Sequence, residues 1–174
     1  MNGVVLVVAT YVLLAIESPL LQEIHVSIYA PDVALVAVLL AAWTMPWIGG
    51  LLTALAVGLL HDAFAMSGPP GLHAEIAVLV FMAAWPLVRR LSPRSTLAVV
   101  AVTFVASLLS SGLFFVLTAI FDRHFAAYGL IGRAALPNAL VTVPVAALLF
   151  PVLARVGVVG RRRLPFELTR EPHR

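Results

Sequence analysis

Residues 31–75 read PDVALVAVLLAAWTMPWIGGLLTALAVGLLHDAFAMSGPPGLHAE, and this stretch decides which class of fold the chain can adopt. Two apolar runs, 33–45 and 47–60, are separated only by Pro46, and neither contains a charged residue. Polar side chains gather only after the second run, beside a Ser-Gly-Pro-Pro-Gly connection that breaks the helices on either side. Apolar runs of this length, joined by short turns, are typical of helices that cross or enter a membrane.

The rest of the chain has the same character. Hydrophobic residues make up 62% of the 174 positions and charged residues only 11%, against about 25% in an ordinary soluble domain. A soluble domain of this size could not bury so much apolar surface, because its surface is large relative to its volume. We therefore predict an all-α integral membrane fold, a compact bundle of six transmembrane helices at about 3–22, 30–45, 47–66, 71–89, 96–121 and 134–157.

These spans form one transmembrane domain, 1–160, followed by a short basic cytoplasmic tail, 161–174. The second span is the shortest, because only Val33 to Met45 is cleanly apolar, about 20 Å of helix. It either starts earlier, near Ile28, or enters the membrane with the third span as a re-entrant hairpin packed against protein. Both alternatives leave the topology of the later spans unchanged.

The basic residues predict the orientation. All eleven are Arg, and most lie at the ends of apolar runs, where an excess of Arg marks the cytoplasmic side. Two such clusters follow the fourth and the last span: Arg89, Arg90 and Arg94; Arg155, Arg161, Arg162 and Arg163. Two spans separate the clusters, so both clusters and both chain termini are expected in the cytoplasm. The Arg residues form no basic stripe on a polar face, so we expect no nucleic-acid partner.

Small residues recur along two of the spans. Gly50, Ala54 and Gly58 lie four residues apart on one face of the third span. Small side chains at this spacing let two helix backbones approach closely within a membrane. The fifth span repeats the pattern with hydroxyl side chains, at Thr103, Ser107 and Ser111. Two interpretations are open for these faces: packing inside the bundle, or docking of a partner's helix.

The connection between the third and fourth spans brings together residues that can do chemistry. His61 and Asp62 precede it, and His73 and Glu75 follow it. These are metal-ligand and acid–base types, but their spacing matches no metal-site motif such as His-Glu-x-x-His. A capping or structural role, a partner-binding role and a metal or catalytic role are the three alternatives. With no Cys and no nucleotide or nucleophile motif, we expect no enzyme activity, no cofactor and no metal.

Other polar residues mark the ends of spans. Glu17 falls late in the first span, where we expect a solvated carboxylate near the outer interface. Pro31-Asp32 and Pro137-Asn138 are interpreted as helix starts, since Pro suits a first helical turn and Asp or Asn suits its free N–H groups. Pro144 and Pro151 should bend the last span. The three tryptophans fit an aromatic belt at the inner interface: Trp43, Trp47 and Trp85.

These motifs together resemble the family of the rod-shape-determining protein MreD. The resemblance is carried by Pro31-Asp32 before an apolar run, by Gly58-Leu59-Leu60-His61-Asp62, and by Gly71-Leu72-His73-Ala74 after a short loop. The last span, from Pro137-Asn138-Ala139 to Pro151 and a basic end, also fits, as do the chain length and the number of spans.

Several expectations follow from this resemblance. It implies a non-enzymatic scaffold of the bacterial cell-elongation machinery, in the cytoplasmic membrane, that binds MreC and lipids. It also implies links to MreB and to RodA with its penicillin-binding transpeptidase. The family is similar in architecture to the substrate-binding subunits of energy-coupling-factor vitamin transporters. The alternative function is therefore a transporter subunit whose ligand pocket is lined by groups such as Glu17, His61, Asp62, His73 and Glu75.

Overall fold

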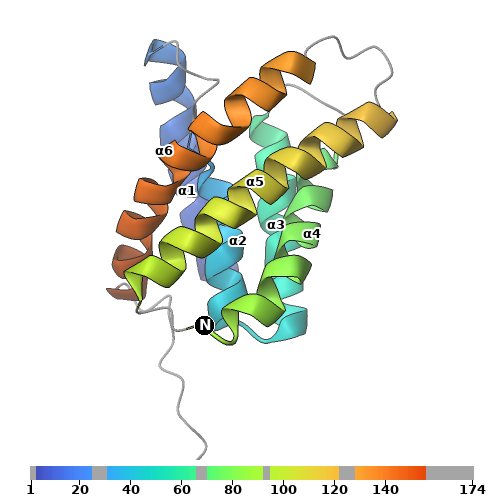
Figure 1. Ribbon diagram of the computed structural model, residues 1–174. Coiled ribbons are helices and arrows are strands. Elements are labelled where there is room, and N and C mark those ends of the chain that lie inside the picture. Colours follow the sequence, from blue (N-terminus) through green and yellow to red (C-terminus); the bar gives the residue numbers. More distant parts are fainter. Residues whose placement is uncertain (1–2, 25–30, 66–69, 92–94, 122–127, 156–174) are drawn as a thin grey trace, which may run out of the picture.

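The computed structural model describes residues 3–24, 31–65, 70–91, 95–121 and 128–155, with only the backbone described at a few helix ends. These residues form six helices (Figure 1). The helices are α1 (Gly3–Ile24), α2 (Val33–Thr44), α3 (Trp47–Phe64), α4 (Leu72–Val88), α5 (Thr96–Phe121) and α6 (Tyr128–Arg155). The predicted all-helical class is confirmed. The tail at 161–174 and the region around Ile28 lie outside the described residues.

Three of these helices are long and apolar enough to cross a membrane. They are α3 over Trp47–Phe64, α5 over Thr96–Ile120 and α6 over Gly132–Val152. The apolar parts described for the other three helices are shorter: Gly3–Glu17, Val33–Thr44 and Leu72–Val88. By length and composition the chain thus has the character of a membrane protein.

Helix α2 is the centre of the bundle. All of its residues from Val33 to Trp43 are buried, and α2 contacts each of the other five helices (Figure 1). This explains why its sequence shows no polar face: every side of the helix meets other side chains. Its 12 residues extend about 18 Å at 1.5 Å per residue, well short of the roughly 30 Å of a bilayer's hydrocarbon core.

Helices α3 and α4 form a closely packed antiparallel hairpin beside α2. The three small residues Gly50, Ala54 and Gly58 are buried. A Cβ atom at Gly58 would clash with Ala74 Cα and lie 2.8 Å from the His73 carbonyl oxygen. At the other end, a Cβ at Gly50 would lie 2.5 Å from the Phe81 ring. This face of α3 is therefore occupied by α4, so it is not free for a partner's helix.

Helices α5 and α6 form a second antiparallel pair, which runs obliquely across α2 (Figure 1). Thr103 and Ser107 of α5 are buried, but Thr103 Oγ1 has no hydrogen-bond partner among the described residues. The interpretation of Pro137-Asn138 as a helix start was wrong. Helix α6 begins at Tyr128, so both residues lie inside it, and a proline within a membrane helix is tolerated where neighbouring groups satisfy the freed backbone.

The lateral surface of the bundle is apolar. Large hydrophobic side chains are exposed on α1, α3, α5 and α6, including Val4, Ile48, Leu97 and Leu148, each at least 70% exposed. A soluble monomer rarely exposes contiguous apolar surface on this scale. Lipid is the solvent that suits such a surface.

Arg89 caps the C-terminal end of α2 through a side-chain hydrogen bond. The Arg89 guanidinium donates a hydrogen bond of 2.7 Å to the carbonyl oxygen of Met45, and it lies 4.8 Å from the centre of the Trp85 ring. Trp43 Nε1 donates to the Leu91 carbonyl at 3.4 Å. These bonds satisfy backbone carbonyls that would otherwise have no partner at a helix end, and they tie α2 to the end of α4.

Candidate functional site

The hairpin between α3 and α4 is fastened by Asp62. Its Oδ1 accepts a hydrogen bond of 2.9 Å from the backbone N–H of His73, and its Oδ2 accepts one of 3.1 Å from Ala74. Both N–H groups lie in the first turn of α4, where a helix has no internal acceptor. The residue before that helix is Gly71, which has no side chain to cap it and adopts a φ of 94°. Asp62 performs this capping role from the preceding helix.

Asp62 also fixes the imidazole of His73. The His73 Nδ1 atom lies 2.9 Å from Asp62 Oδ1, and both side chains are mostly buried. An ionised carboxylate only accepts hydrogen bonds, so Nδ1 must carry the hydrogen. In the neutral ring, Nε2 is then the acceptor nitrogen. Among the described residues, Nε2 has no hydrogen-bond partner.

His61 lies against His73. The centres of the two rings are 4.3 Å apart and the planes are inclined at 40°. The ring centre of Phe114 of α5 lies 5.6 Å from that of His73. The His61 ring is largely buried, and it forms no hydrogen bond within the described part of the chain. The hairpin therefore brings three of the four predicted residues, His61, Asp62 and His73, into one cluster.

Asp32 joins this cluster from the start of α2. Its Oδ1 caps α2 by accepting from the Leu35 N–H at 2.8 Å. Its own N–H donates to Thr142 Oγ1 of α6 at 3.0 Å, and that hydroxyl donates to Asn138 Oδ1 at 3.1 Å. The prediction that Asp32 starts a helix is confirmed. Its proximity to the two histidines was not predicted, because 29 residues of sequence separate Asp32 from His61.

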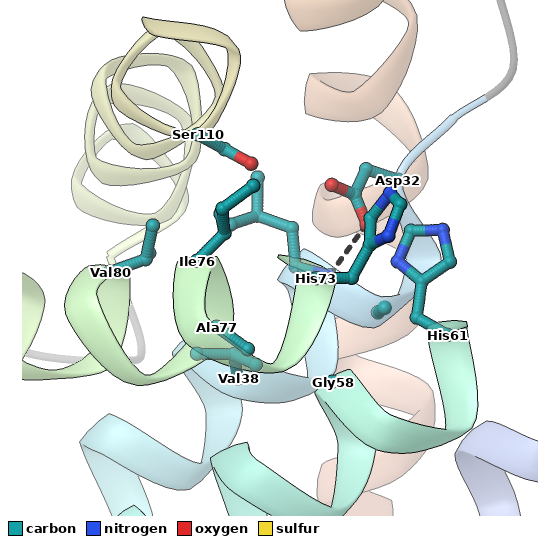
Figure 2. A pocket seen from close by; sticks show the side chains of 11 residues that line it. Asp32, Val38, Gly58, His61, His73, Ile76, Ala77, Val80 and Ser110 are labelled. Atoms are coloured by element: carbon teal, nitrogen blue, oxygen red, sulfur yellow. Dashed lines mark hydrogen bonds between the residues drawn. The ribbon is translucent and has the colours of Figure 1, made fainter. Parts of the chain in front are cut away.

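A small cavity of about 30 Å³ lies between Asp32, His61 and His73 (Figure 2). Four helices supply its walls, and Ser110 of α5 lines the side away from the histidines. The remaining lining residues are small or apolar: Ala34, Leu35, Val38, Gly58, Ile76, Ala77 and Val80. Ser110 was not predicted, because it does not share the four-residue spacing of Thr103, Ser107 and Ser111.

The other predicted polar residues lie outside this cavity. Glu75 is exposed on the first turn of α4 and does not line the cavity. Glu17 is only partly exposed, and its Oε2 atom is buried without a hydrogen-bond partner among the described residues. The expectation of a solvated Glu17 carboxylate was therefore wrong for Oε2, because that atom is buried.

The cluster does not have the geometry of a metal centre. Within the described residues, no group of three His, Cys, Asp or Glu side chains is placed to hold a metal ion. The two carboxylates that belong to it, Asp32 and Asp62, already accept backbone N–H bonds. The arrangement is suited to hydrogen bonding, in which the carboxylates position helix ends and the imidazoles face a small space.

A scan against protein-family models matched no family, and searches of curated proteins and of solved structures found no similar protein.

Proposed function

We propose that this chain is a non-enzymatic membrane scaffold of the MreD type. The observation that supports the proposal is that the polar side chains at the helix ends cap helices. Asp62 and Asp32 cap α4 and α2, and Arg89 binds the carbonyl of Met45, the C-cap residue of α2. Side chains that could perform chemistry instead hold helices together, while the lateral surface is apolar. Such a molecule is suited to presenting surfaces to other membrane proteins.

In this proposal all six helices lie in the bacterial cytoplasmic membrane, and both termini face the cytoplasm. The Arg residues support this orientation: Arg89 and Arg90 follow α4, at the opposite end of that helix from His73 and Glu75. The short helix α2 would be embedded as the centre of the bundle, shielded from lipid by its neighbours. The fold would be similar to that of the substrate-binding subunits of energy-coupling-factor transporters.

The partners follow from the resemblance in sequence. MreC would bind the lateral helix faces and the α3–α4 hairpin, and RodA with its transpeptidase would belong to the same assembly. The Arg residues on the cytoplasmic side, after the fourth and the last span, would lie near MreB and anionic headgroups. Each Arg near an anionic leaflet can gain about 1 kcal/mol, so part of this basic character needs no protein partner.

Affinity purification in mild detergent, followed by mass spectrometry, tests the scaffold. MreC and the synthase pair should co-purify with the wild-type chain. Alanine at both His61 and His73 should leave these partners at normal yield, with at most a graded effect on cell shape. If His61→Ala alone abolished function while every partner still co-purified normally, the scaffold proposal would have to be abandoned. Adjacency of the gene to those for MreB and MreC would provide independent support.

One observation favours a second candidate, the substrate-binding subunit of a small-molecule transporter. The cavity at Asp32, His61 and His73 is lined by polar groups at one side. Its volume of about 30 Å³ is far below the roughly 300–1,000 Å³ of sites for drug-sized ligands. A vitamin-sized substrate would require the helices to separate. Co-purification with an ATPase module in place of MreC would favour this candidate.

A further inference from the structure

The groups that line the cavity between α2, α3, α4 and α5 offer more hydrogen-bond acceptors than donors, since the donors are the Ser110 hydroxyl and one N–H of a neutral His61 ring. Asp32 contributes a carboxylate, and His73 contributes the Nε2 lone pair that remains after Nδ1–H is directed to Asp62. His61 contributes an imidazole that has no hydrogen bond to any described residue. Figure 2 shows these three side chains side by side at one end of the cavity. None of the cavity-lining residues is Arg or Lys.

Polar groups that are partly withdrawn from water are stabilised when they find partners, and a carboxylate such as Asp32 can accept further hydrogen bonds beyond that from the Leu35 N–H. The occupant of this cavity should therefore donate hydrogen bonds in several directions and carry positive charge. The volume of about 30 Å³ also limits its size, since a water molecule requires about 10–15 Å³ by this measure. An ammonium group meets all three requirements, because it is close to water in size, cationic, and a donor only.

The spacing of the groups distinguishes ammonium from a metal ion. Coordination bonds from His or Asp to a transition metal are about 2.0–2.2 Å long, and no three described side chains stand that close to a common point. In hydrogen bonds from N–H groups, the donor nitrogen and the acceptor atom are about 2.7–3.2 Å apart. A hydrogen-bonding cation can therefore bind groups that are too far apart to coordinate one metal ion.

We propose that the cavity lined by Asp32, His61 and His73 binds a small ammonium cation, either the ammonium ion or a short primary amine. Asp32 supplies the charge, His73 Nε2 and the His61 ring accept hydrogen bonds, and Asp62 positions the His73 ring. Occupancy would join the start of α2 to the α3–α4 hairpin. This site is independent of the scaffold proposal. Ammonium binding can fail while MreC still co-purifies, and ammonium can bind while MreC does not co-purify.

Thermal unfolding of the purified chain in detergent tests the site. A ligand that binds only the folded chain raises the melting temperature with a saturable dependence on concentration. Ammonium chloride and methylammonium chloride should do so. The potassium ion matches the ammonium ion in charge and approximate size but has no N–H group, so potassium chloride should not raise the melting temperature at equal ionic strength. Tetramethylammonium chloride should not raise it either.

Asp32→Asn is the decisive variant, because Asn caps a helix about as well as Asp while it removes the charge. It should raise the half-saturating ammonium concentration about tenfold or more, since a bond to a charged acceptor is replaced by one to a neutral acceptor. Glu75→Gln is the matched control: it removes the same charge from an exposed position outside the cavity, and it should leave the half-saturating concentration unchanged.

A measurement without any variant complements these titrations. In protein labelled with [15N]histidine, ammonium should shift the Nε2 resonance of His73 while Nδ1 stays hydrogen-bonded to Asp62. Equal stabilisation by potassium and ammonium, or unchanged affinity in Asp32→Asn, would overturn the proposal. Stabilisation by micromolar Zn²⁺ with no response to ammonium would also overturn it, in favour of a metal site.

Discussion

Replacing Asp62 with alanine should loosen the α3–α4 hairpin more than any other single polar substitution at that end of the molecule. The carboxylate accepts three hydrogen bonds, from the His73 N–H, the His73 ring and the Ala74 N–H. Loss of a helix cap costs about 0.5–2 kcal/mol, and a bond to a charged group is worth about 1.5–3 kcal/mol. Because such contributions overlap, we expect a total loss of about 2–4 kcal/mol.

Thermal unfolding in detergent, followed by tryptophan fluorescence, measures this loss. Asp62→Asn keeps an acceptor oxygen and should fall between the wild type and Asp62→Ala. His73→Ala removes only the side-chain bond to the carboxylate and should cost about 1.5–3 kcal/mol, less than Asp62→Ala. Glu75→Ala, at an exposed position, should remain within about 0.5 kcal/mol of the wild type. Hydrogen exchange at the Ala74 amide should accelerate in Asp62→Ala. If Asp62→Ala unfolded at the same temperature as Glu75→Ala, the cap would contribute nothing and the reasoning would be refuted.

Three further predictions concern other parts of the fold. Gly58→Leu should disrupt folding and assembly more than Leu59→Ala, because the added side chain meets the backbone of α4 and overpacking costs about 1–3 kcal/mol; normal expression and complex formation by the Leu variant would contradict this. Single cysteines at Ser92 and Pro165 should resist labelling from outside the cell, whereas one placed between α5 and α6 should react, and outside labelling at either inner position would refute the proposed topology. Arg89→Gln should lower the melting temperature, because it weakens the hydrogen bond from residue 89 to the Met45 carbonyl at the end of α2. An unchanged melting temperature would show that this hydrogen bond is dispensable.

The sequence predicted the helical class and most helix positions because long apolar runs and Gly-Pro breaks are local signals. The third span, expected at 47–66, is helical over Trp47–Phe64. The start of α6 was misplaced, because Pro137 is a strong helix-start signal only when the preceding residues are not themselves helical. The second span, expected at 30–45, is helical over Val33–Thr44, close to the cleanly apolar run. Its central position depends on contacts with every other helix, which no local pattern reveals.

The candidate site was only partly predictable, for the same reason. His61, Asp62 and His73 lie on two helices joined by a short connection, so their proximity follows from the hairpin itself. Asp32 and Ser110 reach the cavity from α2 and α5, and their approach depends on how the two helix pairs pack. The direction of the Asp62 carboxylate, toward the free N–H groups of α4, could be anticipated only by noticing that Gly71 offers no cap.

The short central helix also has a consequence for how the chain enters a membrane. Twelve residues are too few to partition stably across a bilayer alone, since a spanning helix needs about 20. If the chain is inserted in order, α2 cannot be released into lipid as an independent unit. It must be retained by the insertion machinery until α3 and α4 arrive to cover it. The order of synthesis would then matter, and moving α2 to the end of the chain should trap the protein in a misassembled form even though every contact of the final bundle remained available.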